Sequence, residues 1–336
     1  MVVRTRFVVT LALVGIVSLL GLSCANDDGA MPNAEESVTE SIVPATTTAP
    51  IVDLPDVVVT YSVLGAFVER LVGEVADVVV LIPDGQDPHD FEPSPRDIEL
   101  INNAELVVAN GLDLEEGLDD ALDTAQNSGL PVFFVADHVT VLDVVDVNDH
   151  SSHGHNHAGA QTEHPNDHVH SKDPHVWLSP ATMLEALPAL TSAASDALGT
   201  DLSASRLTFS DELIALDTEI QRNFADLRNC QLVTGHNELG YFAQRYGCTV
   251  IAAILSSPST TAEESAGNVE FVIDVIKTHD ARAIFTSLGT NPAVAQQVAD
   301  AVGVELVEIS THYLGSTTSY VEFIRTLGAT IATSLR

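Results

Sequence analysis

Short apolar runs alternate with longer helix-like segments from about residue 55 to the end of the chain. The runs expected to form strands are Val78–Ile82, Leu106–Ala109, Val132–Val135, Leu232–Thr234, Val250–Leu255, Ala283–Thr286 and Val304–Ile309. In the segments between them, apolar residues recur with the spacing of a helix. Strands that alternate with helices form parallel sheets, so this feature predicts an α/β fold.

Two segments interrupt this alternation and divide the chain. Residues 149–172 are polar and rich in histidine, and they cannot bury a core. Residues 202–228 keep one helical pattern that would extend about 40 Å at 1.5 Å per residue. This helix either joins two lobes or is an ordinary long surface helix. We expect an amino-terminal lobe over residues 52–201, which carries the insertion, and a carboxy-terminal lobe over residues 229–336.

The first residues have the pattern of an export signal. Two arginines precede the apolar run Phe7–Leu20, which is shorter than the ~20 residues that a membrane span needs. Cleavage before Cys24 would leave that cysteine at the start of the mature chain. The segment resembles a bacterial lipoprotein signal, although the leucine of Gly21–Cys24 stands one position later than usual. A plain secretory signal with an incidental cysteine is the alternative.

These features predict a signal peptide over residues 1–23 and a disordered tether over residues 24–51, which is rich in Ala, Thr, Asp, Glu and Pro. We expect an exported protein at the outer face of the cell membrane, anchored through a lipid on Cys24. In that oxidising compartment Cys230 and Cys248 can form a disulfide, or they can remain two buried thiols.

The charge of the chain excludes one class of partner. The sequence has 13 Lys and Arg residues against 48 Asp and Glu residues, a formal net charge of −35. A nucleic-acid-binding protein needs basic patches, which this chain lacks. The acidity would suit a cation, although a solvated acidic surface also explains it.

Four histidines outside the insertion stand at positions where ligands gather. His89, His236 and His312 each follow the end of an apolar run, and His175 comes just after the insertion. Ligands of open α/β sheets bind at the carboxyl ends of strands. We therefore expect the four imidazoles to converge on one crevice.

Two of these histidines lie in matching motifs. Asp87–Phe91 and Asp173–Trp177 share the pattern Asp-Pro-His-x-aromatic, and each soon reaches a Ser-Pro pair. The proline restricts the backbone beside the histidine, and the aspartate or a carbonyl can orient the imidazole. The repeated motif indicates a metal site more strongly than either copy would alone.

The order of these motifs resembles the cluster A-I metal-binding lipoproteins, the solute-binding components of bacterial zinc and manganese ABC transporters. The matching segments are Gly85–Pro95, the histidine-rich insertion, Asp173–Pro180, the long helix, Thr234–Phe242 and Arg245–Gly247. The resemblance covers residues 52–336. It implies two Rossmann-like lobes with parallel sheets, joined by a long rigid helix, with the metal site in the crevice between them.

The resemblance also implies three metal ligands. His89, His175 and His236 match the first three ligand positions of that family, in which a histidine at the third position accompanies zinc and a glutamate accompanies manganese. Imidazole suits zinc, whereas manganese prefers carboxylate oxygen. The implied function is the capture of Zn²⁺ and its delivery to the membrane permease and cytoplasmic ATPase of an ABC importer. This chain has no P-loop motif of its own.

The fourth ligand position departs from the family. The family commonly has an aspartate after the strand before the last helix, and Val307–Leu314 contains none. One alignment places His312 there and gives a four-histidine shell. Another places Ser310 there and leaves three histidines and a water. We favour His312. The family's frequent glutamate after the preceding strand is also missing, because Ser287 stands near that position.

The insertion carries seven more histidines: His150, His153, His155, His157, His164, His168 and His170. Zinc-binding members of the family have a loop of this composition here. It would act as an accessory zinc collector or sensor, or it is a solvated spacer. We interpret His138 and His279 as structural or surface residues.

Zinc capture is not the only function that these residues would suit. Three histidines and a water on zinc also make a hydrolase or lyase site, in which Glu238, two residues after His236, is the only obvious acid beside that ligand. A closed four-histidine shell argues against catalysis. A binding protein for manganese or another divalent metal, or a surface adhesin or zinc buffer, would also fit. Because neutral imidazole is the ligand, we expect zinc affinity to fall as the pH drops through about 6.5.

Overall fold

The structure is a computed structural model that describes residues 54–145, 147–148, 172–262 and 265–336. Residues 52–336 cluster as one compact unit. The expected signal peptide, the tether, Cys24 and all seven histidines of the insertion lie outside the described residues. Among the residues that are described, no helix has both the length and the apolar character needed to cross a membrane.

The first sheet has four parallel strands in the order β2-β1-β3-β4. These are β1 (Asp56–Tyr61), β2 (Asp77–Ile82), β3 (Leu106–Ala109) and β4 (Val132–Phe134). Strand β1, in the interior of the sheet, was not among the expected strands, and a helix begins directly after it at Ser62. The helices of this part are α1 (Ser62–Val72), α2 (Pro95–Asn102), α3 (Asp119–Asn127) and α4 (Pro180–Leu198).

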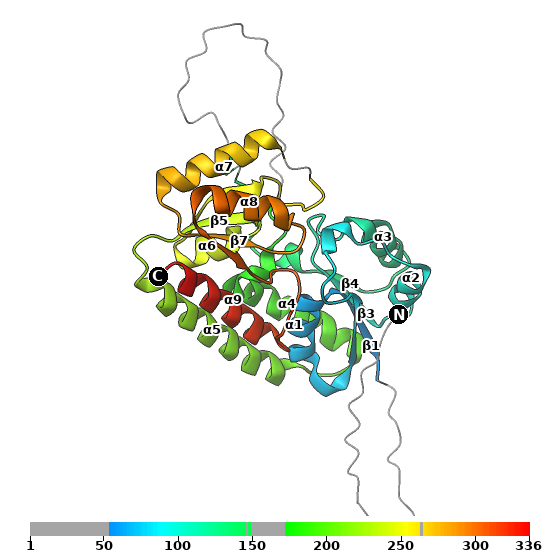
Figure 1. The fold of residues 1–336 in the computed structure, drawn as a ribbon. Coiled ribbons are helices and arrows are strands. Elements are labelled where there is room, and N and C mark those ends of the chain that lie inside the picture. Colours follow the sequence, from blue (N-terminus) through cyan, green and yellow to red (C-terminus); the bar gives the residue numbers. More distant parts are fainter. Residues whose placement is uncertain (1–53, 146, 149–171, 263–264) are drawn as a thin grey trace, which may run out of the picture. The chain divides into compact units, whose positions relative to one another are not determined.

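The second sheet repeats this topology with four parallel strands in the order β6-β5-β7-β8. Its strands are β5 (Gln231–His236), β6 (Thr249–Leu255), β7 (Ala283–Thr286) and β8 (Glu305–Glu308). Its helices are α6 (Gly240–Tyr246), α7 (Ala266–His279), α8 (Pro292–Val302) and α9 (Tyr320–Ser334). Figure 1 shows these elements in yellow to red. The prediction of an α/β fold with two lobes and parallel sheets is confirmed.

The long helix α5 (Ser203–Ala225) lies between the two sheets in sequence and packs against α1, α4 and α9. Its buried face carries Phe209, Leu213, Leu216 and Ile220. Leu207 belongs to the same helical pattern but is 57% exposed. The helix therefore contacts elements from both ends of the described chain.

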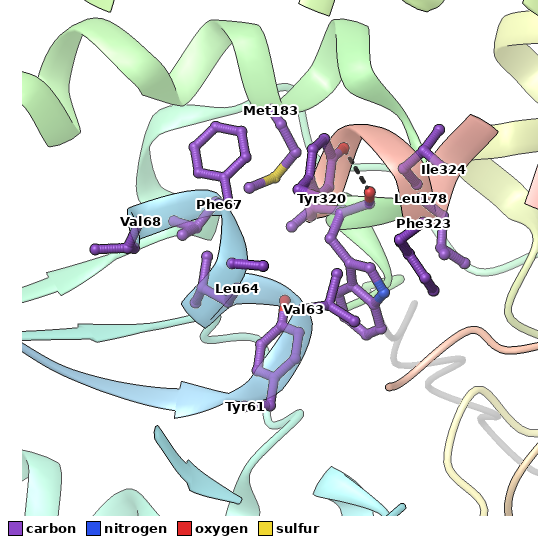
Figure 2. Close-up of a cluster of buried hydrophobic side chains, with 14 of the residues drawn as sticks. Tyr61, Val63, Leu64, Phe67, Val68, Leu178, Met183, Tyr320, Phe323 and Ile324 are labelled. Carbon is purple, nitrogen blue, oxygen red and sulfur yellow. Dashed lines mark hydrogen bonds between the residues drawn. The ribbon is translucent and has the colours of Figure 1, made fainter. Parts of the chain in front are cut away.

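One apolar core connects the two halves of the described chain. Figure 2 shows Phe67 and neighbouring side chains of α1 packed toward Met183 of α4 and toward Tyr320 of α9. The Tyr320 hydroxyl donates a hydrogen bond of 2.8 Å to the carbonyl of Trp177, which is fully buried. The last helix of the chain is thus held against the first.

A disulfide joins Cys230 to Cys248, with a sequence separation of 18 residues. Cys230 directly precedes β5, and Cys248 directly precedes β6. The two strands are parallel neighbours, so their first residues lie at the same edge of the sheet. The disulfide is therefore at the opposite end of β5 from His236.

Candidate metal centre

Four buried histidines come together from both sheets. His89 lies in the short 3-10 helix η2 (Pro88–Asp90) after β2, and His175 directly precedes the 3-10 helix η6 (Val176–Leu178). His236 is the last residue of β5, and His312 follows β8. Their exposed fractions are 7%, 0%, 0% and 1% in the same order. The expectation that they converge is met in the geometry.

The ring nitrogens of these residues have the spacing of a metal shell. One nitrogen from each histidine lies within 4.8 Å of every other. The Nε2 atoms of His175 and His236 are 3.4 Å apart. A tetrahedral zinc ion with Zn–N bonds of about 2.0–2.1 Å separates its ligand nitrogens by about 3.4 Å. The pair therefore matches one edge of such a tetrahedron.

The two Asp-Pro-His motifs orient their histidines differently. Asp173 accepts hydrogen bonds from the backbone N–H of His175, at 3.0 Å, and from its ring Nδ1, at 2.8 Å. From His89, Asp87 accepts a hydrogen bond of the backbone N–H, at 3.1 Å, where it caps η2, and within the described residues no hydrogen bond joins it to the ring. The expected orientation of the imidazole by its aspartate thus occurs in the second motif alone.

Two glycines allow the site to be this compact. A Cβ on Gly235 would stand 2.0 Å from the Thr290 hydroxyl oxygen, and a Cβ on Gly240 would stand 2.4 Å from an Asp173 carboxylate oxygen. No side chain larger than hydrogen fits at either position without a shift. Glycine therefore permits the close approach of β5 and α6 to the residues around the histidines.

The hydrogen bonding leaves buried ring nitrogens of the cluster without a partner in the described part of the chain. Because His175 Nδ1 donates to Asp173, its Nε2 carries a lone pair toward His236 Nε2. His89 Nε2 and His312 Nε2 are buried and have no hydrogen-bond partner among the described residues. Buried nitrogens without a donor are costly. A cation among them would satisfy all of them together, so the residues fit a divalent metal.

Burial sets the protonation state of the rings. It lowers the pKa of His89 to about 3, with a further contribution from the nearby His175. It also lowers the pKa values of His236 and His312 well below the ordinary value, again with neighbouring histidines adding to the effect. These three rings are therefore neutral, and ready to act as ligands, at neutral and mildly acidic pH.

One buried carboxylate lies behind two of the rings. Glu238 is fully buried, and its oxygens are 3.6 Å from His236 Nδ1 and 3.8 Å from His312 Nδ1. Burial raises its pKa to about 7, against the opposing effects of His175 and of hydrogen bonds from Thr311 and Ser287. From the sequence, Glu238 was a candidate only as the acid of an enzyme. Its position two residues after a ligand was the available signal.

Of the other described residues considered from the sequence, His312 belongs to the cluster and the rest lie outside it. The structure places His312 with the other three histidines, whereas Ser310 lines a small cavity with Phe323 and Thr326. His138 is exposed and stacks on Phe133, and His279 is exposed at the end of α7. Ser287, which stands where the family has a glutamate, donates a hydrogen bond of 2.7 Å to Glu238.

The lowered pKa values change the expected pH dependence. Three solvated imidazoles would carry about two protons at pH 6, and zinc would displace them. Because the folded-state pKa values lie below the ordinary 6.5, His89, His236 and His312 stay neutral as the pH falls through that value. We therefore expect these three rings to release almost no protons when zinc binds at pH 6. We also expect the zinc affinity to fall at a pH lower than the value of about 6.5 that the sequence predicts.

Calorimetry of zinc binding at pH 6, in buffers with different ionisation enthalpies, measures this proton release. Glu238, with a pKa of about 7, can add at most one further proton. Release of two or more protons from the three rings would contradict the burial of these histidines in the metal-free protein.

Comparison with known proteins identifies the family of this chain. Residues 57–334 match the family described as "Zinc-uptake complex component A periplasmic", ZnuA. A Treponema pallidum protein described as metal-binding is 30% identical over 258 residues, which are 76% of this chain and 78% of that protein. The zinc-binding protein AdcA of Streptococcus pyogenes serotype M3 is 28% identical over 263 residues. The match covers 76% of this chain but only 50% of AdcA.

Solved structures share the fold. The periplasmic zinc-binding protein TroA of Treponema pallidum matches with a TM-score of 0.71 at 22% identity, over 84% of this chain and 99% of that one. A crystal structure of ZnuA matches with a TM-score of 0.69 at 22% identity, over 84% of this chain and all of that one. With the match over residues 57–334, these findings show that the chain belongs to the ZnuA family of periplasmic zinc-uptake components.

Proposed function

We propose that this protein is an extracytoplasmic zinc-binding protein that captures Zn²⁺ among His89, His175, His236 and His312 and delivers it to an ABC importer. Members of its family are solute-binding transport components and not enzymes. The observation that carries the proposal is the set of four buried imidazoles whose nitrogens lie within 4.8 Å of one another. Such a shell has four protein ligands and no open position for catalysis.

The donor set is the argument for zinc. All four ligand candidates are neutral nitrogen donors, and no carboxylate oxygen belongs to the cluster among the described residues. Zinc accepts imidazole in tetrahedral geometry, whereas manganese prefers more oxygen donors. Kinship alone does not decide the metal. AdcA is named for zinc, but a structural neighbour from Candidatus Liberibacter asiaticus, with a TM-score of 0.68, is titled as manganese-bound.

Competition between zinc and manganese tests this choice. We expect the metal-stripped protein to bind one zinc tightly and to retain it against a large excess of manganese. The same result is expected when residues 149–171 are replaced by a short Gly-Ser linker, because four histidines of the described residues already supply a complete set of ligands. Bound metal per chain is the measurement. Preferential retention of manganese would overturn the metal, and zinc binding that requires residues 149–171 would overturn the site.

The other parts of the proposal concern delivery. The histidines of residues 149–172 would collect zinc near the site or sense its supply. Cleavage before Cys24 and lipidation of that cysteine would hold the protein at the outer face of the cell membrane. The permease and ATPase are separate chains in this proposal. The chain spans about half the length of the streptococcal AdcA proteins, so the additional part of those proteins has no counterpart in this match.

A further inference from the structure

We propose that Glu238 is a positioning residue that orients His236 and His312 together, so that both rings present Nε2 to the cation. The cation is the Zn²⁺ of the proposed function, and its identity rests on that proposal. The ring tautomers that it requires can be measured without any metal. No side chain in the cluster itself is changed by the test.

The carboxylate is shared between the two rings. Its Oε1 lies 3.6 Å from His236 Nδ1, and its Oε2 lies 3.8 Å from His312 Nδ1. The two rings stack with an interplanar angle of 23° and a centroid distance of 5.1 Å. Both Nδ1 atoms therefore face one carboxylate, while the Nε2 atoms belong to the opposite edge of each ring.

Two of the atoms concerned have no hydrogen-bond partner of their own in the described chain. Glu238 Oε2 and His236 Nδ1 are buried and have no hydrogen-bond partner among the described residues. His312 Nδ1 is 3.0 Å from the Thr311 hydroxyl, which lies beside it and can link the ring to the carboxylate. A shortening of roughly half an ångström or a bridging hydroxyl gives each Nδ1–H an acceptor. The carboxylate is thus the acceptor available to both rings.

The chain fixes the carboxylate at this place. The backbone N–H of Glu238 donates to the His236 carbonyl at 2.9 Å, and this tight turn places Glu238 behind the His236 ring. The Ser287 hydroxyl, just after β7, donates to Oε1 at 2.7 Å. Strands β5 and β7 are hydrogen-bonded neighbours. Glu238 is therefore held from two adjacent strand ends.

Charge gives a second reason for a carboxylate here. Four neutral imidazoles leave the two positive charges of a zinc ion uncompensated in a buried site, which is costly. Asp173 holds Nδ1 of His175 at 2.8 Å, and Glu238 takes the same place for His236 and His312. Two carboxylates behind three rings would balance the charge of the cation. Acceptors of this kind raise the basicity of histidine ligands and fix their tautomers.

The test compares Glu238→Gln, which keeps the shape and removes the charge, with the wild-type chain. In the metal-free protein, long-range ¹H–¹⁵N spectra should show His236 and His312 as Nδ1–H tautomers, and the substitution should shift at least one of them. Zinc affinity, measured by chelator competition, should fall about 10- to 100-fold. Ser287→Ala, which removes the donor to Oε1, should change both readouts in the same direction and by less.

Asp217→Asn is the matched control. Asp217 is a buried acid that pairs with Arg245, in contact with no residue of the cluster, so its loss should lower stability and leave the tautomers and zinc affinity unchanged. Nε2–H tautomers of His236 and His312 in the wild-type protein would overturn the inference, as would a Glu238→Gln variant with unchanged tautomers and affinity. If the tautomers respond but the wild-type site binds no zinc, the proposed function fails and the orienting role of Glu238 stands.

Discussion

His236→Ala is expected to weaken zinc binding strongly. His236 is fully buried, and its Nε2 is 3.4 Å from that of His175 at the centre of the cluster. Structural zinc sites with four ligands have binding free energies of about 10–16 kcal/mol, so one ligand corresponds to about 2.5–4 kcal/mol. This is a loss of roughly a hundredfold to a thousandfold in affinity. Chelator competition on metal-stripped protein measures the change.

His279→Ala is the matched control for that substitution. His279 is an exposed histidine at the end of α7, outside the cluster, and its removal should leave the affinity as it was. Retention of wild-type affinity in His236→Ala would show that the zinc is held elsewhere. The histidines of the insertion would then become the leading candidates, and the four buried residues would have no role as ligands.

Phe67→Ala is expected to lower the free energy of unfolding by about 3–5 kcal/mol, the usual cost of removing a buried phenylalanine. Phe67 is fully buried, and its ring centroid lies 4.7 Å from that of Phe209 and 5.1 Å from that of Tyr320. These partners come from α5 and α9. Because the ring connects three helices that are distant in sequence, neighbouring side chains can fill the resulting cavity only in part.

Urea unfolding of the metal-free protein measures this loss. We expect one unfolding transition for the whole described unit, with its midpoint shifted to a lower urea concentration. The shift should be large, because a protein of this kind has only about 5–15 kcal/mol of stability in total. Leu207→Ala on the exposed face of α5 is the control and should change the stability by less than about 0.5 kcal/mol. A loss below about 1 kcal/mol for Phe67→Ala would contradict the packing between α1, α5 and α9.

The expected strands and the observed ones agree where apolar runs are long or well bounded. The runs Leu106–Ala109 and Ala283–Thr286 coincide with β3 and β7. Strand β1 was missed because it runs without a break into α1, so no turn residue separates the two patterns. In α5, helical spacing identified the helix, but Leu207, which shares the spacing of the buried residues, is exposed. Spacing alone does not say how wide the covered face of a helix is.

The histidines illustrate a different limit. Parallel sheets put the ends of their strands at one edge, so the positions of His89, His236 and His312 after apolar runs were enough to predict their convergence. The choice between His312 and Ser310 was open in the sequence, because a loop after a strand can place either side chain inward. In the structure, the path of the chain after β8 brings His312, which is 1% exposed, beside the other ligand candidates.

Residue type and local spacing were enough to predict the fold class, the set of candidate ligands and the preference for nitrogen donors. The acidic side chains that lie beside the rings of those ligands could be identified only in the folded chain. Asp173 reaches the ring of its histidine while Asp87 contacts the backbone N–H of His89, although both lie in the same motif. Glu238 meets His312 from a different strand end, far along the sequence. Such contacts depend on burial and on the packing of separate strands, which no local pattern encodes.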